Sequence, residues 1–88
     1  MPLISQFYGI LIYIYFELGG HHHKPHFHAK YGEYEVSITL EGKKISGNMP
    51  DKQMKLIDAW LVIHKEELKA AWYAYNDSGE IIKIKGLE

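Results

Sequence analysis

At Pro50 the spacing of hydrophobic residues changes from the two-residue period of strands to the period of a helix. This change constrains the fold more than any other feature of the sequence. Pro50 suits the first helical position, where a missing amide hydrogen costs nothing, and Asp51 suits the positive end of the helix dipole. From there onwards the residues on one side of the predicted helix are mostly apolar: Met54, Ile57, Leu61, His64, Leu68, Ala71, Trp72 and Tyr75, with Trp60 at the margin. A cluster of turn-forming residues at positions 76–79 ends the pattern. The sequence therefore predicts one long amphipathic helix over residues 50–75.

The segments around this helix alternate at the two-residue period of β-strands. Residues 7–16 carry apolar groups on both faces, which is typical of one long strand covered on both sides. Residues 34–40 show the cleanest alternation, and residues 26–31 and 44–47 predict two further strands. Residues 81–84 predict a last strand after the helix. The predicted fold is α+β in the order β-β-β-β-α-β, a mostly antiparallel sheet of about five strands with one long helix packed on one face.

Length and composition narrow the functional classes. Eighty-eight residues support one hydrophobic core, so we expect a single domain over residues 1–88. The absence of cysteine excludes disulfides and thiolate metal ligands, and it is compatible with the cytoplasmic localisation that we expect. The apolar run at residues 10–16 is shorter than the roughly 20 residues of a membrane helix, and no basic residue precedes it as in a signal peptide. We therefore expect no membrane partner.

The charge pattern argues against a nucleic-acid partner. The net charge is −1, and all ten basic residues are lysines that form no long run. Recognition of phosphate and guanine favours the planar guanidinium of arginine, and a nucleic-acid groove needs clustered positive charge.

Five of the six histidines fall within residues 21–28. In the predicted strand 26–31, His26 and His28 point to the same face, about 6–7 Å apart along the chain, while Phe27 faces the core. Such a pair can chelate one metal ion, and His22 in the preceding loop can supply a third ligand. Three histidines with a water molecule form a known catalytic zinc arrangement. The alternative is a solvated or partner-contacting histidine loop without metal.

His64 interrupts the apolar side of the predicted helix. A polar side chain at such a position needs a hydrogen bond or a place at the edge of the buried patch. One interpretation is a core histidine bonded to a backbone or hydroxyl group. In the other, the helix brings His64 to His26 and His28 as a ligand or proton carrier. The predicted metal site is therefore His22, His26, His28 and His64, with a divalent transition metal such as zinc as the cofactor.

These motifs resemble a bacterial domain-of-unknown-function family, numbered 4160, whose members are small single-domain proteins. The resemblance rests on four blocks: Met1-Pro2-Leu3-Ile4-Ser5-Gln6-Phe7-Tyr8-Gly9, Pro25-His26-Phe27-His28-Ala29-Lys30-Tyr31, Gly47-Asn48-Met49-Pro50, and the helix ladder Trp60, His64, Leu68, Trp72. In the family an acidic residue, a histidine, a variable position and a proline precede the second block. Here His22 matches that histidine, whereas His21 replaces the acid and Lys24 replaces the proline.

The resemblance implies a partner but not an activity, because the family has no established function. Its genes resemble halves of two-gene cassettes, similar to toxin–antitoxin pairs. Independently, one helix leaves a face of the predicted sheet uncovered, and a long apolar strand favours pairing with another chain. We therefore expect a protein partner or a homo-oligomer, such as a dimer.

Three functional hypotheses follow. The first is a small protein-interaction or regulatory module, as one half of a toxin–antitoxin-like pair, with the histidine block in the contact surface. The alternative is a histidine-based metal-binding protein or metal-dependent hydrolase. The third is a toxin that acts on nucleic acid, with histidine as general acid and base. No nucleophile motif and no phosphate-binding loop occurs in the sequence, so an enzymatic role depends on the histidines alone.

Overall fold

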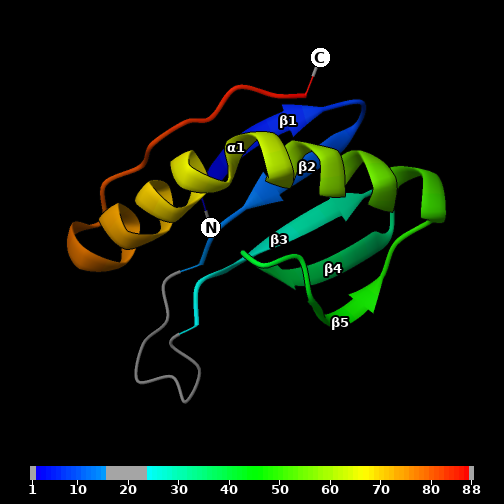
Figure 1. Cartoon of the computed structure of the whole chain (residues 1–88), viewed down its shortest axis with the longest axis horizontal. Helices are drawn as coiled ribbons and strands as arrows, with labels where there is room; N and C mark the ends of the chain where they lie inside the picture. The colour runs from blue at the N-terminus through cyan, green and yellow to red at the C-terminus, as the bar shows by residue number, and fades with distance from the viewer. Residues whose placement is uncertain (1, 16–23, 88) are drawn as a thin grey trace.

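The computed structural model describes residues 2–15 and 24–87. Within these residues a long helix, α1 (Asp51–Ser78), lies across one face of a five-stranded antiparallel sheet (Figure 1). The strands follow one another in space as in sequence: β1 (Leu3–Phe7), β2 (Ile10–Tyr13), β3 (His26–Tyr31), β4 (Tyr34–Thr39) and β5 (Lys44–Asn48). The predicted α+β class, with one long helix packed on a five-stranded sheet, is confirmed.

The first apolar segment folds back on itself, so the prediction of one strand over residues 7–16 is wrong. Phe7 at the end of β1 lies opposite Ile10 at the start of β2. The two residues between them have positive φ, 48° for Tyr8 and 80° for Gly9, as in a type I′ hairpin turn. Glycine adopts this conformation readily, whereas tyrosine rarely does. Position 16 of the predicted strand lies outside the described residues.

β3 and β4 follow the predicted alternation. Their ladder places Phe27 opposite Ile38 and Ala29 opposite Val36, and these four side chains are buried in the core with residues of α1. Because neighbouring residues of a strand point to opposite faces, the side chain of His28 lies on the face of the sheet away from α1.

β5 is an edge strand with irregular pairing. The register between β4 and β5 shifts between Ser37 and Ile38. Further along, Gly47 has a φ of 92°, and a Cβ atom at this position would lie 2.1 Å from the carbonyl oxygen of Glu35. Only glycine permits so close an approach of the two backbones.

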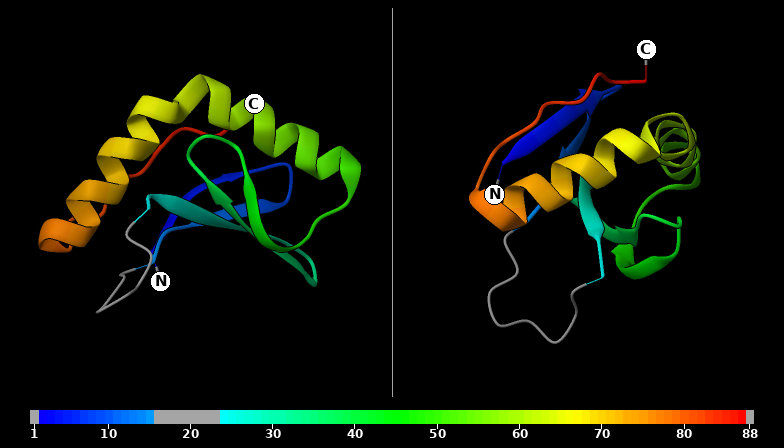
Figure 2. Two further views of the ribbon diagram at one scale, coloured as in Figure 1. Left: turned by 60° about the horizontal axis from the view of Figure 1, so that its bottom comes forward. Right: turned by 60° about the vertical axis from the view of Figure 1, so that its left-hand side comes forward.

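α1 begins at Asp51, directly after Pro50, and is bent in the middle. It ends where Gly79 takes a left-handed conformation and donates its amide hydrogen to the carbonyl oxygen of Tyr75 at 2.8 Å. His64 has non-helical angles (φ −112°, ψ 19°), and Figure 2 shows the helix axis changing direction near this region. Within residues 2–15 and 24–87, no helix combines the length and the apolar character that crossing a membrane requires.

The helical pattern placed Trp60 at the margin of the apolar side. In the structure Trp60 lies at the centre of the packing between α1 and the sheet. It is fully buried. Its ring stacks on Phe7 with the centroids 5.5 Å apart, and it meets Phe27 edge-on at 5.8 Å. One indole therefore joins the first strand, the third strand and the helix.

The segment after α1 runs beside β1 in extended form (Figure 1), but it is not the strand that we predicted for residues 81–84. Its amide at Ile84 donates to the carbonyl oxygen of Ile4 at 2.7 Å. The next carbonyl, that of Lys85, accepts the indole hydrogen of Trp60 at 3.0 Å instead of continuing a ladder. The observed order is therefore five strands followed by the helix.

Candidate functional site

The strand histidines His26 and His28 lie side by side on the face of the sheet opposite α1, as their alternation predicts. Their ring centroids are 5.3 Å apart with the rings edge to face. His26 is buried, with 8% of its surface exposed, and the side chain of His28 is 14% exposed. The two imidazoles are thus close enough to act on one small ligand or ion.

Residues of two other strand regions surround His28. The ring of Tyr15, just beyond β2, stacks on the imidazole with the centroids 3.8 Å apart and the planes at 18°. From β4, the Ser37 hydroxyl oxygen lies 3.0 Å from Nδ1, and a carboxylate oxygen of Glu35 lies 3.8 Å from the same nitrogen. The Glu35 carboxylate, which only accepts hydrogen bonds, favours a hydrogen on Nδ1 of His28.

Tyr15 acts in this cluster as a hydrogen-bond donor. Burial raises the pKa of its hydroxyl above the ordinary value, and the charge of Glu35 and a hydrogen bond to it raise the pKa further. The hydroxyl therefore stays protonated at neutral pH. On the same face, the ammonium group of Lys30 lies 5.7 Å from the ring centroid of Tyr13.

The tautomer of neutral His26 is set by its backbone contact. Its Nδ1 lies 2.9 Å from the carbonyl oxygen of Lys24, which can only accept, so Nδ1 carries the hydrogen and Nε2 carries the lone pair. Histidines that bind metals commonly donate their second nitrogen's hydrogen to a carbonyl or carboxylate oxygen in this manner. In both His26 and His28, Nδ1 is directed at oxygen atoms, which suits metal binding through Nε2.

The structure does not bring His64 to this pair. His64 lies on α1, on the opposite side of the sheet from His26 and His28. Its Nδ1 is 2.6 Å from a carboxylate oxygen of Glu67, and its ring is 5.8 Å from that of Trp60. Its partner is thus a carboxylate one helical turn away and not the backbone or hydroxyl group that one interpretation predicted.

The four-histidine metal site stays a prediction. His22, its proposed loop ligand, lies outside the described residues. In the part of the chain that the structure describes, no group of three or more histidine, aspartate or glutamate side chains is arranged to hold a metal ion. The structure therefore offers two adjacent imidazoles, and further ligands would have to come from elsewhere.

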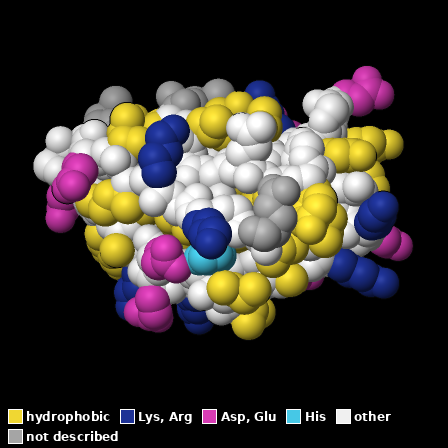
Figure 3. All heavy atoms as spheres, turned by 90° about the horizontal axis from the view of Figure 1, so that it is seen from above, with side chains coloured by type: hydrophobic (Ala, Val, Ile, Leu, Met, Phe, Trp, Pro, Cys, Tyr) yellow, Lys and Arg dark blue, Asp and Glu magenta, His cyan; other side chains and the backbone are white. Residues whose placement is uncertain are grey.

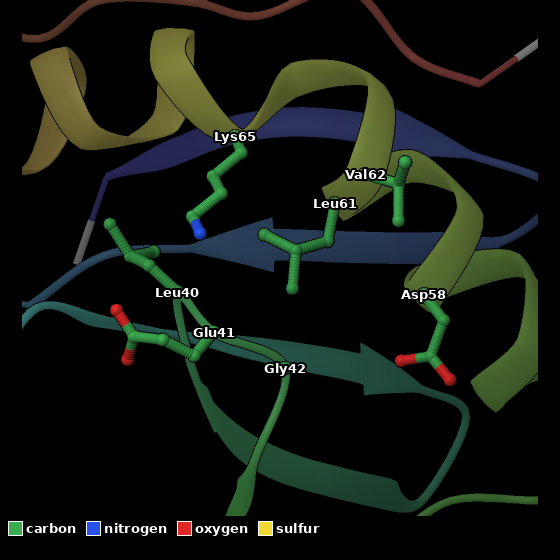
Figure 4. Close-up of a pocket in the computed structure, with 7 residues that line it drawn as sticks. All are labelled: Leu40, Glu41, Gly42, Asp58, Leu61, Val62 and Lys65. Carbon is green, nitrogen blue, oxygen red and sulfur yellow. The ribbon is translucent and has the colours of Figure 1, made fainter.

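A second candidate site is a pocket of about 340 Å³ between α1 and the turn that joins β4 to β5 (Figure 4). Leu61 of α1 points into it, and Lys65 and Asp58 lie at its two ends. We call the α1 surface the seven residues that line this pocket: Leu40, Glu41, Gly42, Asp58, Leu61, Val62 and Lys65.

The α1 surface places an exposed aliphatic side chain beside charges that form no ion pair among the described residues. Val62 is 79% exposed and its neighbour Ile63 is 63% exposed. Burial beside the pocket raises the pKa of the Asp58 carboxyl, although the residue as a whole is exposed. Among the residues that the structure describes, neither Asp58 nor Lys65 forms an ion pair.

The wider surface on this side is mixed. Seen from above the view of Figure 1, hydrophobic side chains gather in separate clusters, with lysine and acidic side chains between them (Figure 3). The α1 surface is distinguished by the pocket that its residues line. Sequence reasoning missed this surface, because it considered only the apolar side of the amphipathic helix. The signal was present at Val62 and Ile63, two adjacent aliphatic residues among lysines and acids.

The fold and these two sites define a small α+β protein whose antiparallel meander is covered by one helix. The chain belongs to the family described as domain of unknown function (DUF4160), whose model matches residues 9–73, so the predicted family is confirmed. The match excludes β1 and the segment after α1, which pack on each other through the bond between Ile84 and Ile4. The sequence matches no curated protein and no solved structure.

Proposed function

We propose that this chain is a protein-interaction module and that the α1 surface is its contact surface. The observation that carries the proposal is Val62, an aliphatic residue in mid-helix that is 79% exposed beside a pocket lined by Leu40 and Leu61. Single exposed aliphatic residues are common on monomers. Here, however, the residue stands beside a pocket flanked by Asp58 and Lys65, which form no ion pair within residues 2–15 and 24–87. Burying a valine against a partner contributes roughly 1.5–3 kcal/mol.

The edges of the sheet support the choice of the helix side. Strand addition needs an open, regular edge. The C-terminal segment lies beside β1 and bonds to it at Ile4, and the pairing of β5 is shifted at Ser37. A partner therefore gains more by covering the α1 surface than by extending the sheet.

The finer form of the proposal is one half of a two-protein regulatory pair of the toxin–antitoxin type. Its support is the family resemblance, which implies a partner encoded by the adjacent gene. The product of that gene is accordingly the first hetero-partner to test. Self-association of the chain is tested beside it.

Two measurements test the proposal. Calorimetric titration with the product of the adjacent gene measures hetero-association, and analytical ultracentrifugation of the chain alone measures self-association. Val62→Asp should weaken the association by at least about tenfold, because it places a charge where an aliphatic side chain is buried. Ile81→Asp makes the same kind of change at a 51% exposed position after α1 and should leave binding unchanged. A chain that binds neither itself nor that product would contradict the proposal.

A second candidate function, metal binding or metal-dependent hydrolysis at His26 and His28 with His22, is favoured by one observation. Nδ1 of His26 is held by a backbone carbonyl, and Nδ1 of His28 faces Ser37 and Glu35, so a metal would bind each ring through Nε2. Zinc is the first metal to test, because imidazole nitrogen is among its preferred ligands.

Zinc titration of untagged protein tests this second candidate. Replacing His26 and His28 together with alanine should abolish tight binding. His64→Ala is the matched control, because this histidine lies across the sheet and its loss should leave binding unchanged. Loss of binding in His64→Ala would instead support the four-histidine site. The absence of tight zinc binding to the unaltered chain would refute both versions.

A further inference from the structure

We infer that a second copy of this chain covers the α1 surface, packed antiparallel on α1 about a two-fold axis that passes between Leu61 and Val62. The inference rests on the proposed interaction function and names its partner. The inferred arrangement depends on the positions of three side chains, those of Asp58, Lys65 and Val62.

The charges on this face are arranged symmetrically about the aliphatic centre. Asp58 and Lys65 are seven residues apart, with the bend at His64 between them, and both line the same pocket. Figure 4 shows them at opposite ends of the pocket with Leu61 between them. Midway between them lies the junction of Leu61 and Val62.

A two-fold axis at this junction pairs both of the α1 charges, Asp58 and Lys65, that form no ion pair among the described residues. It places Asp58 of each copy opposite Lys65 of the other, which gives two ion pairs. It also places the exposed Val62 of each copy opposite Leu61 in the pocket of the other. A two-fold interface requires this kind of self-complementarity, whereas a parallel, in-register pair of helices would set like charges against each other.

The size of this contact predicts a weak, reversible dimer. A stable interface buries about 800 Å² on each partner. Here α1 is bent at His64, so two copies touch mainly along the middle of the helix and at the β4–β5 turn. Because exposed ion pairs contribute part of the attraction, added salt should weaken the dimer.

Charge reversal tests the pairing directly. Sedimentation equilibrium up to millimolar protein should show the unaltered chain approaching the mass of a dimer. Asp58→Lys leaves two lysines on the contact face, and Lys65→Asp leaves two aspartates, so each variant alone should associate at least about tenfold more weakly. An equimolar mixture of the two variants should associate again, because every pair across the axis is then opposite in charge. The double variant Asp58→Lys/Lys65→Asp should also recover self-association.

The outcomes separate this inference from the proposed function. A chain that is monomeric at millimolar concentration overturns the inference. If such a chain still binds the adjacent gene's product in a manner sensitive to Val62→Asp, the interaction function stands. A dimer that is insensitive to both single reversals, or a variant mixture that stays monomeric, overturns the pairing. Helical circular dichroism confirms folding, and Asp58→Arg with Lys65→Glu repeats the test should either first variant unfold.

Discussion

Replacing Gly47 with alanine tests how closely β5 packs on β4. Gly47 has a φ of 92°, a conformation that costs an alanine roughly 1–2 kcal/mol. A Cβ atom there would lie 2.1 Å from the carbonyl oxygen of Glu35 and 2.9 Å from the Cα atom of Val36. Both neighbours are backbone atoms, which cannot rotate away as the end of a side chain can. β5 must therefore move.

The magnitude follows from the size of that movement. Since a Cβ atom essentially never lies within 3.0 Å of a non-bonded atom, the contact at 2.1 Å requires a shift of about 1 Å. Such a shift breaks one or two ladder hydrogen bonds, each of which contributes about 1 kcal/mol. Together with the strained φ, Gly47→Ala should lower the free energy of unfolding by about 2–4 kcal/mol, which lowers the melting temperature by roughly 10–30 °C.

Urea unfolding followed by circular dichroism measures this loss, and Gly32→Ala is the matched control. Gly32 also has a positive φ, 60°, but nothing lies within 4 Å of the place that a Cβ atom would take there, so only the backbone cost of about 1 kcal/mol applies. Equal losses in the two variants would refute the steric part of the reasoning. A larger loss in Gly47→Ala isolates the close approach of the two strands.

Three further predictions follow from single side chains. Trp60→Phe should cost about 1–2 kcal/mol more in urea unfolding than Trp72→Phe, because only the Trp60 indole makes a hydrogen bond within the described residues, and equal costs would contradict this. Glu35→Gln should lower the raised pKa of Tyr15 without restoring its ordinary value, because burial is the larger cause; phenolate absorbance, with Tyr15→Phe as the reference, measures this. The raised pKa of Asp58 means that the folded state binds the proton more tightly, so stability falls as the pH rises through the range just above 3.8; Asp58→Asn should flatten that fall in urea titrations, and an unchanged slope would contradict the assignment.

The elements that obey a hydrophobic period were predictable from the sequence. α1, β3 and β4 lie where the helical and alternating patterns placed them, because one face of each packs into the core. The hairpin at Tyr8 escaped prediction, because a tyrosine at positive φ carries no turn signal and residues 7–16 form one nearly continuous apolar run. The segment at Ile84 alternates like a strand, but the carbonyl of Lys85 bonds to the Trp60 indole, which no pattern local in sequence could indicate.

The candidate sites divide in the same way. Alternation placed His26 and His28 on one face, which needs only the period of a single strand. The contacts of His28 with Tyr15 and Ser37 depend on register between separate strands, which the sequence alone did not specify. His64 lies on the other side of the sheet from His26 and His28 because α1 packs on the face that carries Phe27 and Ala29. The hollow at the α1 surface depends on how the β4–β5 turn meets the helix and has no sequence period.

The two edges of the sheet bear on how the native protein behaves at high concentration. Growth of a fibril by strand addition needs a flat edge with free backbone groups. One edge is bordered by the segment that bonds at Ile84, and the other begins with Lys44 and is distorted at Gly47. The native chain is thus a poor template for fibril growth. Detachment of the C-terminal segment would expose the regular edge of β1, so partial unfolding at Ile84 is a step at which fibril seeding would begin.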